Sequence, residues 1–320
     1  MELTDGSPAR LSFVQHTIAG MHPLICKIKE SPIKDTPFPH VMINDFLGES
    51  LFQELISHPD INLGPCTDVN ELNGSLNVAG WEVQLHPGCI ATFAEYREVR
   101  EGKALYKDVN SYGHASRHQL LSGSGIAYRY QRSESSAILD LISLFHSEEL
   151  LKALYEKFEI HHETTYDCGL QKYLHGYEIP PHPDIRSKAL TFMLNLNTDP
   201  QSSLAEYHTH FMRLRPKYNY IYRFWDNHDE IQRCWIPWEW CLTSNRHRIN
   251  NSICIFKPSS HSLHAVRASY EDLTHQRTQL YGNLWYKKPT PSQACTFEDL
   301  VPTSPLILSS SLLSSIPQSS

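Results

Sequence analysis

The feature that most constrains the fold is a series of short β-prone runs in the second half of the chain, separated by turn residues. The runs lie at residues 169–177, 188–197, 208–214, 218–224, 251–256, 264–268 and 277–285. Short strands at irregular spacing with turns between them are typical of sandwiches and barrels. The pattern therefore predicts a β-barrel or sandwich as the core of the protein.

The first half of the chain has a mixed pattern. A Pro-bounded run over residues 37–47 predicts a strand that leads into a helix. Over residues 137–158 the apolar positions recur at helical spacing, and Ser147 is a candidate N-cap between two helices. Residues 60–135 are rich in Gly, Ser and Asn and predict loops with a few strands. We expect an α+β protein with a mainly β core.

Charge and composition exclude several classes of protein. The 28 basic residues are outnumbered by 35 acidic ones and are scattered, which argues against a nucleic-acid partner. No apolar stretch approaches the roughly 18 residues of a membrane span, and no signal peptide is apparent. The eight cysteines form no CxxC pair, which argues against a zinc ribbon or a disulfide framework. We expect a cytoplasmic protein.

The domain organisation follows from these patterns. We expect an N-terminal extension over residues 1–35, a single domain over residues 36–290 with its β core at about 160–290, and a disordered Ser/Pro-rich tail over residues 291–320.

A His-x-Asp triplet, formed by His182 and Asp184, lies just ahead of the strand expected at residues 188–197. An imidazole and a carboxylate at this spacing can converge on one point. With one histidine from a distant strand they would form a facial triad, which holds Fe(II) and leaves positions open for a co-substrate and O₂. A second triplet, at residues 58–60, has no strand after it, and we interpret it as a turn.

Two histidines compete for the third ligand position. The strand expected at residues 251–256 leads to His261 and His264. Serines flank His261, as in a loop, whereas Ala265 and Val266 continue a strand after His264. We therefore favour His264.

These residues resemble a known family. The chain is similar to iron(II)/2-oxoglutarate-dependent oxygenases of the prolyl-4-hydroxylase-like branch, over roughly residues 36–286. The likeness rests on Pro37-Phe38-Pro39-His40, Asp45-Phe46-Leu47, the His-x-Asp triplet, Phe256-Lys257-Pro258, His264-Ala265-Val266, Arg277 and Gly282-Asn283-Leu284-Trp285. It implies a double-stranded β-helix, a jelly-roll or cupin-like fold, flanked by N-terminal helices. It also implies His182, Asp184 and His264 as iron ligands.

The same resemblance assigns Arg277 to the far carboxylate of 2-oxoglutarate. A guanidinium fork suits this task because it meets a carboxylate with two parallel hydrogen bonds. Some branches of the family carry Ser two positions later, where this chain has Gln279. Related enzymes often place a hydroxyl near the co-substrate, and Tyr173 is the candidate, with packing inside the barrel as the alternative.

Several further residues are candidates for the substrate pocket. Thr191 and Met193 share one face of a strand and could line the pocket or pack in the core. His208 and His210 also share a face, and we favour contact with the substrate or with the residues around the metal. Trp225 and Trp238 belong to a Trp-rich segment that could cover the mouth of the barrel or form a local aromatic core.

The resemblance implies an enzyme that uses Fe(II) with 2-oxoglutarate and O₂ as co-substrates, with ascorbate as a candidate reductant, and that releases succinate and CO₂. Halogenases of this family lack the carboxylate ligand, so Asp184 favours hydroxylation or another oxidation of a C–H bond. We expect a small-molecule substrate, such as an amino acid or a natural-product intermediate in biosynthesis. The alternatives are a prolyl-type protein hydroxylase, a zinc-dependent hydrolase and a non-catalytic jelly-roll binding protein.

Overall fold

The computed structural model describes residues 23–84, 92–103, 125–131, 135–287, 293, 295 and 297–301. Its strands are β1 (Val41–Ile43), β2 (Trp81–Val83), β3 (Ala127–Tyr130), β4 (Thr164–Tyr173), β5 (Glu178–His182), β6 (Lys188–Asn195), β7 (Thr209–Leu214), β8 (Cys241–His247), β9 (Ile253–Phe256), β10 (His264–Arg267) and β11 (Arg277–Tyr286). The helices are α2 (Glu49–Ser57), α3 (Val69–Val78), α4 (Phe93–Arg100), α6 (Ser136–Phe145), α7 (Glu148–Phe158) and α8 (Tyr220–Asn227), and residues 23–30 are also helical.

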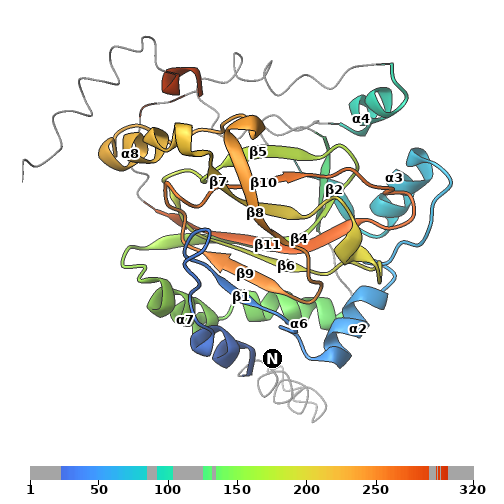
Figure 1. The fold of residues 1–320 in the computed structure, drawn as a ribbon. Helices are drawn as coiled ribbons and strands as arrows, with labels where there is room; N and C mark the ends of the chain where they lie inside the picture. The colour runs from blue at the N-terminus through green and yellow to red at the C-terminus, as the bar shows by residue number, and fades with distance from the viewer. Residues whose placement is uncertain are drawn as a thin grey trace, which may run out of the picture.

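Two antiparallel sheets face each other (Figure 1). The larger has seven strands in the order β1-β9-β6-β11-β4-β3-β2, and the smaller has four in the order β5-β10-β7-β8. From β4 to β11 the chain passes back and forth between the sheets, with β7 and β8 as the consecutive pair that stays in the smaller sheet. This path is that of a double-stranded β-helix, or jelly roll, and it confirms the fold expected from the sequence.

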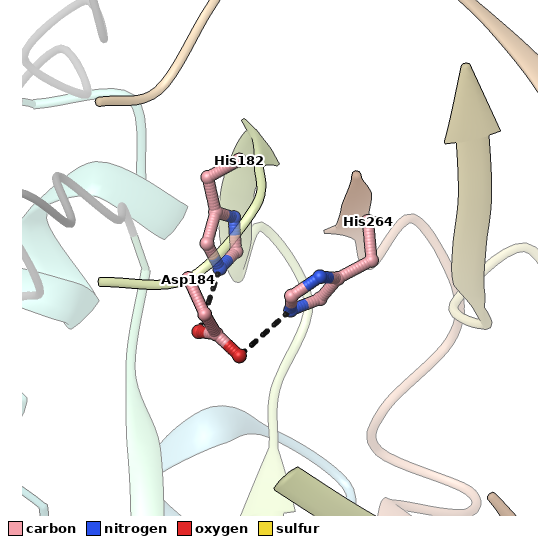
Figure 2. Close-up of side chains that lie close together, drawn as sticks. All are labelled: His182, Asp184 and His264. Carbon is pink, nitrogen blue, oxygen red and sulfur yellow. Dashed lines mark ion pairs between the residues drawn. The ribbon is translucent and has the colours of Figure 1, made fainter. Parts of the chain in front are cut away.

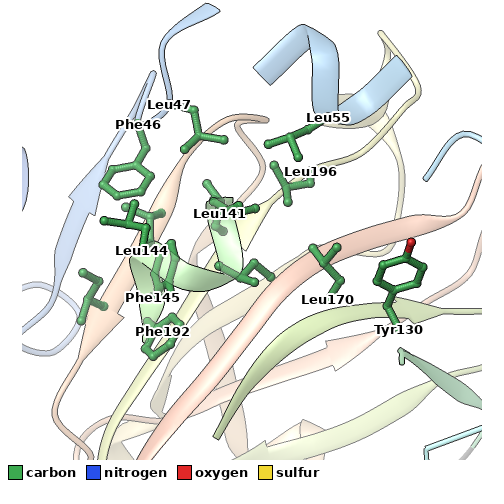
Figure 3. Packing of buried hydrophobic residues seen from close by; sticks show 14 of the residues in the cluster. Phe46, Leu47, Leu55, Tyr130, Leu141, Leu144, Phe145, Leu170, Phe192 and Leu196 are labelled. Carbon is green, nitrogen blue, oxygen red and sulfur yellow. The ribbon is translucent and has the colours of Figure 1, made fainter. Parts of the chain in front are cut away.

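Helices cover the outer face of the larger sheet (Figures 1 and 3). The predicted pair of helices is confirmed as α6 and α7, and the Ser147 side chain accepts a hydrogen bond from the backbone N–H of Leu150. Phe145 of α6 stacks on Phe192 of β6, with 5.2 Å between ring centroids. Because the helices bury this face, the inner faces of the two sheets are left to form the site.

Gly282 shows how closely β11 approaches β6. It pairs with Phe192, and a Cβ atom added at Gly282 would lie 2.2 Å from the Phe192 ring. No side chain fits beneath that ring without displacing it, since real Cβ contacts are not this short. The glycine therefore sets the packing of the two strands that carry much of the site.

The structure corrects several sequence-based expectations. Residues 218–224 were expected to form a strand, but most of them belong to α8, where Ile221 and Trp225 are buried at the i, i+4 spacing of one helical face. Residues 60–135 include two helices, α3 and α4, as well as strands. Two core strands, β5 and β8, were not predicted.

The folded part of the chain extends beyond the expected domain boundaries on both sides. Leu24 and Ile28 belong to the main apolar cluster, ahead of residue 36. Cys295 and Leu300 are buried in a second cluster, within the segment expected to be a tail. Residues 1–22 and 302–320 lie outside the described residues. In the described part of the chain, no helix is both long and apolar enough to cross a membrane.

Candidate metal centre and co-substrate pocket

Strand register brings the two expected histidine ligands together. His182 is the last residue of β5 and His264 the first of β10, and the two are direct partners in the antiparallel ladder. Asp184 follows two residues after His182 with a left-handed backbone (φ 62°), a conformation that Asp tolerates better than most residues. One ligand atom from each of the three side chains lies within 4.8 Å of the others, and all three side chains are buried (Figure 2).

Backbone carbonyl groups fix the orientation of both imidazoles. Nδ1 of His182 lies 2.8 Å from the carbonyl oxygen of Pro180, and Nδ1 of His264 lies 2.9 Å from that of Ser262. A carbonyl oxygen only accepts, so each Nδ1 carries a proton, and in the neutral imidazole that leaves Nε2 with the lone pair that can coordinate a metal. Both Nε2 atoms face Asp184, at 3.5 and 3.8 Å from its carboxylate oxygens. These separations leave room for a cation between the ligands.

The charge states of the site suit a divalent cation. Burial lowers the pKa of His264 to about 3, so its imidazole is neutral and able to coordinate. Burial alone would raise the pKa of Asp184, but the neighbouring Lys188 ammonium holds it well below its usual value. Two imidazoles and one carboxylate are the donor set of a non-haem Fe(II) triad.

The Asp184 carboxylate is held by two further residues of β6. Nζ of Lys188 donates to Oδ1 at 2.6 Å, and Oγ1 of Thr191 donates to Oδ2 at 2.8 Å. Thr191 was a candidate for the pocket or the core, and the structure places it against Asp184. Lys188 was not singled out, because in the sequence it is one more polar residue at the start of an expected strand.

Arg277 lies at the far end of the same inner face. It is the first residue of β11 and pairs with Tyr173, whose ring centroid lies 4.5 Å from the guanidinium carbon. Its Nη2 donates to Oγ1 of Thr209 at 3.1 Å and to Oε1 of Gln279 at 3.0 Å. The Gln279 amide in turn donates to Oδ1 of Asn195 at 2.7 Å. Gln279 thus orients the arginine.

The guanidinium of Arg277 is buried without a carboxylate partner. Among the described residues, no ion pair within 4.0 Å is formed by this side chain, which is 2% exposed. Burial lowers its pKa, and the groups that oppose the shift are tyrosines rather than acids. A desolvated charge of this kind favours an anion from outside the chain.

Successive inward-facing residues of β6 connect the two ends of the site. Thr191 contacts Asp184, Asn195 contacts Gln279, and Met193 lies between them on the same face. Met193 packs in an apolar cluster with Phe38, Phe211, Cys254 and Phe256. The inner face therefore has the His-Asp-His group at one end, an apolar middle and a cationic end.

The rival histidine and the second triplet lie outside this arrangement. The His261 side chain is 52% exposed, stacks on Tyr222 and pairs with Asp226 at 3.4 Å. His58 follows α2 and lies 3.9 Å from Asp60, in the turn that was expected. In the described part of the chain, His182, Asp184 and His264 form the one group of His, Cys, Asp or Glu side chains close enough to share a cation.

The other histidine candidates have partners of their own. His208 is buried, with Nε2 at 2.7 Å from the carbonyl oxygen of Ser202, and burial lowers its pKa to about 4. Nδ1 of His210 lies 2.9 Å from Oγ1 of Thr243. His210 also packs edge-on against Trp238. The structure does not bring either histidine into the triad.

The two tryptophan candidates lie on the other face of the smaller sheet. Trp225 is buried in a cluster with Ala265, which alternates with the inward-facing His264. Trp238 belongs to the border of that cluster and donates from Nε1 to Glu178 at 2.6 Å, beneath Arg267. Both tryptophans thus belong to a local aromatic cluster, which was the alternative left open by the sequence.

No protein-family model matches this chain, and no curated protein is similar to it in sequence. Among solved structures, it is similar to a Pseudomonas putida prolyl-4-hydroxylase, with 12% identity, 83% of this chain and 99% of that chain covered, and a TM-score of 0.38. It is also similar to a Trichoplax adhaerens prolyl hydroxylase in complex with a hypoxia-inducible-factor peptide fragment (12% identity, 86% and 92% covered, TM-score 0.40). A third is HygX from Streptomyces hygroscopicus, with nickel, 2-oxoglutarate and hygromycin B bound (9% identity, 69% and 95% covered, TM-score 0.30). At these values the activity has to be inferred from the site's own residues.

Proposed function

We propose that this protein is an Fe(II)- and 2-oxoglutarate-dependent oxygenase, with His182, Asp184 and His264 as the iron ligands. The donor set fits the metal, because both Nε2 lone pairs and a charged carboxylate converge in a buried space. When bound, the iron with 2-oxoglutarate and O₂ supplies the oxidation of an unactivated C–H bond, with release of succinate and CO₂.

The observation that carries this proposal is the buried Arg277 cation, which has no carboxylate partner among the described residues and lies at the opposite end of the inner face from the triad. 2-Oxoglutarate has a keto acid at one end, two methylene groups, and a carboxylate at the other end. Arg277 would bind the far carboxylate, and Met193 would contact the methylenes. A zinc hydrolase needs three ligands and a water, but it has no use for a buried guanidinium at this place.

The other residues of the site would orient the bound groups and exclude water. Gln279 and Thr209 accept hydrogen bonds from the Arg277 guanidinium, and Tyr173 packs against it. The donors for the far carboxylate of 2-oxoglutarate would therefore be in place before it binds. Thr191 holds Asp184 in the same way. Asp184 fills the third ligand position, which favours hydroxylation or a related oxidation over halogenation.

We propose a small molecule, such as an amino acid or a natural-product intermediate, as the substrate, and a protein side chain as the second candidate. Two arginines of the N-terminal half, which could bind a charged substrate, are paired with acidic residues of the chain itself. Arg100 and Arg129 pair with Asp272 and Asp167, at 3.0 and 2.9 Å. Those pairings favour a substrate recognised by shape and by neutral polar groups.

Succinate formation tests the proposal. The metal-free protein is supplied with Fe(II), 2-oxoglutarate, O₂ and ascorbate, and succinate is followed by NMR, first alone and then with panels of free amino acids and of proline-containing peptides. We expect succinate production that Asp184→Ala abolishes and added zinc inhibits. Faster turnover with peptides than with small molecules would select the second substrate class. Zinc-activated hydrolysis without succinate would overturn the proposal.

A further inference from the structure

Lys188 has a setting that the expected iron site does not require. It begins β6, is 5% exposed, and donates to Oδ1 of Asp184 at 2.6 Å and to the Tyr281 hydroxyl at 3.0 Å. Its ammonium also lies over the rings of Tyr281 and Trp285, 5.7 and 5.4 Å from their centroids. The ammonium is therefore enclosed by a metal ligand on one side and two aromatic rings on the other.

Stability alone does not account for this arrangement. A buried ion pair contributes little compared with apolar side chains of similar volume, because both charges lose their hydration. Tyr281 and Trp285 occupy alternate, inward-facing positions of β11 and hold the ammonium in place through cation–π contacts. The cation is thus fixed at one distance from the triad.

A fixed positive charge at this place acts directly on a bound cation. Nζ lies 2.6 Å from Oδ1, so a metal ion bound to either oxygen of Asp184 lies within about 6 Å of the ammonium. At that distance, repulsion by a unit charge lowers the affinity for a divalent cation about tenfold even at the dielectric constant of water. The effect is larger in a buried site. A trivalent cation is opposed more strongly than a divalent one.

We propose that Lys188 is a positioning residue that orients Asp184 and partly neutralises it, which weakens metal binding at the triad and favours the ferrous over the ferric ion. This inference rests on the proposed metal site. The hydrogen bond to Oδ1 fixes the carboxylate plane, and the charge sets the affinity. The two effects can be separated by substitution.

The test is a titration of the metal-free, full-length protein with Mn(II), following the paramagnetic resonance signal of the free ion. Lys188→Met removes both the charge and the hydrogen bond, and Lys188→Gln removes the charge but keeps a donor. We expect both variants to bind Mn(II) about tenfold more tightly or better, and Lys188→Arg to stay near the wild-type affinity. Iron-loaded Lys188→Gln should also show a lower ferric/ferrous midpoint potential.

A surface lysine provides the matched control. Lys152→Met makes the same change at a side chain that is 76% exposed on α7, and it should leave the Mn(II) affinity unchanged. Unchanged or weaker binding in both Lys188→Met and Lys188→Gln, with thermal unfolding like that of the wild type, would overturn the role of Lys188. A different result would overturn the metal site itself, and this inference with it. That result is a wild-type protein that binds no Mn(II), or that binds Mn(II) no better than Asp184→Ala does.

Discussion

Tyr173 and Arg277 are direct partners in the ladder of β4 and β11, and the tyrosine ring lies against the guanidinium at 4.5 Å. This pairing places a buried cation at the end of the inner face opposite His182, Asp184 and His264. The Tyr173 ring packs against the guanidinium. The hydroxyl donates to Gln171.

Replacing Arg277 should affect the co-substrate rather than the metal. Arg277→Ala removes the charge-assisted hydrogen bonds to the far carboxylate, so we expect the affinity for 2-oxoglutarate to fall by roughly a hundredfold while Mn(II) affinity changes little. Calorimetric titration of the Mn(II)-loaded protein with 2-oxoglutarate measures this. An unchanged affinity would show that the carboxylate binds elsewhere.

The choice of the third ligand can be tested with a pair of alanine variants. His264→Ala should abolish tight binding of a divalent cation, because the facial set loses one of three donors. His261→Ala, three residues earlier, should bind the cation like the wild type, since His261 faces Asp226 and solvent. Metal loss in His261→Ala, with retention in His264→Ala, would reverse the assignment.

Lys172 predicts a pH-dependent stability away from the site. It is fully buried, it donates to the carbonyl oxygen of Ile61 and to Thr278, and burial lowers its pKa to about 7. Between pH 7 and the unfolded pKa of about 10.5 the unfolded chain holds more protons than the folded one, so stability rises with pH. We expect the wild type to gain about 2–3 kcal/mol relative to Lys172→Met between pH 7 and 9, as measured by urea unfolding. Parallel stability curves for the two proteins would contradict the low pKa.

Two glycine substitutions should have opposite effects on the free energy of unfolding. Gly282→Ala places a methyl group against the Phe192 ring, and we expect a loss of about 1–3 kcal/mol in the free energy of unfolding. Gly74 lies within α3 and has nothing within 4 Å of an added Cβ, so Gly74→Ala should gain about 0.5–1 kcal/mol. Thermal unfolding of both variants checks the pair. A neutral Gly282→Ala would mean that β6 and β11 are less tightly packed.

The positions of the core strands along the chain could be predicted where apolar residues mark them. β6, β9 and β11 are buried on both faces and read as continuous apolar or β-prone runs. β8 gave no such signal, because it is an edge strand whose middle residues are exposed. β5 contains Pro180 and Pro181, which a sequence pattern counts against a strand but an edge strand accepts.

The candidate site also has residues that could be predicted from the sequence and residues that could not. The triad and Arg277 could be located because their spacing resembles that of a known family. Lys188 and Thr209 could not, since their settings depend on contacts with β11 that the local pattern does not encode: Lys188 contacts Tyr281, and Thr209 contacts Arg277. The prediction of a strand at residues 218–224 was wrong, because tertiary packing of Ile221 and Trp225 favours a helix over these residues.

We propose that one site binds Fe(II) and 2-oxoglutarate together. Anaerobic titration of the metal-free protein with Fe(II) and then with 2-oxoglutarate tests it directly, through the weak visible charge-transfer band of their chelate. We predict a band that appears only when both are present, is absent in His182→Ala, and needs far more 2-oxoglutarate in Arg277→Ala. The absence of a band in the wild type, together with tight binding of zinc, would contradict the account and favour a hydrolase or a binding protein.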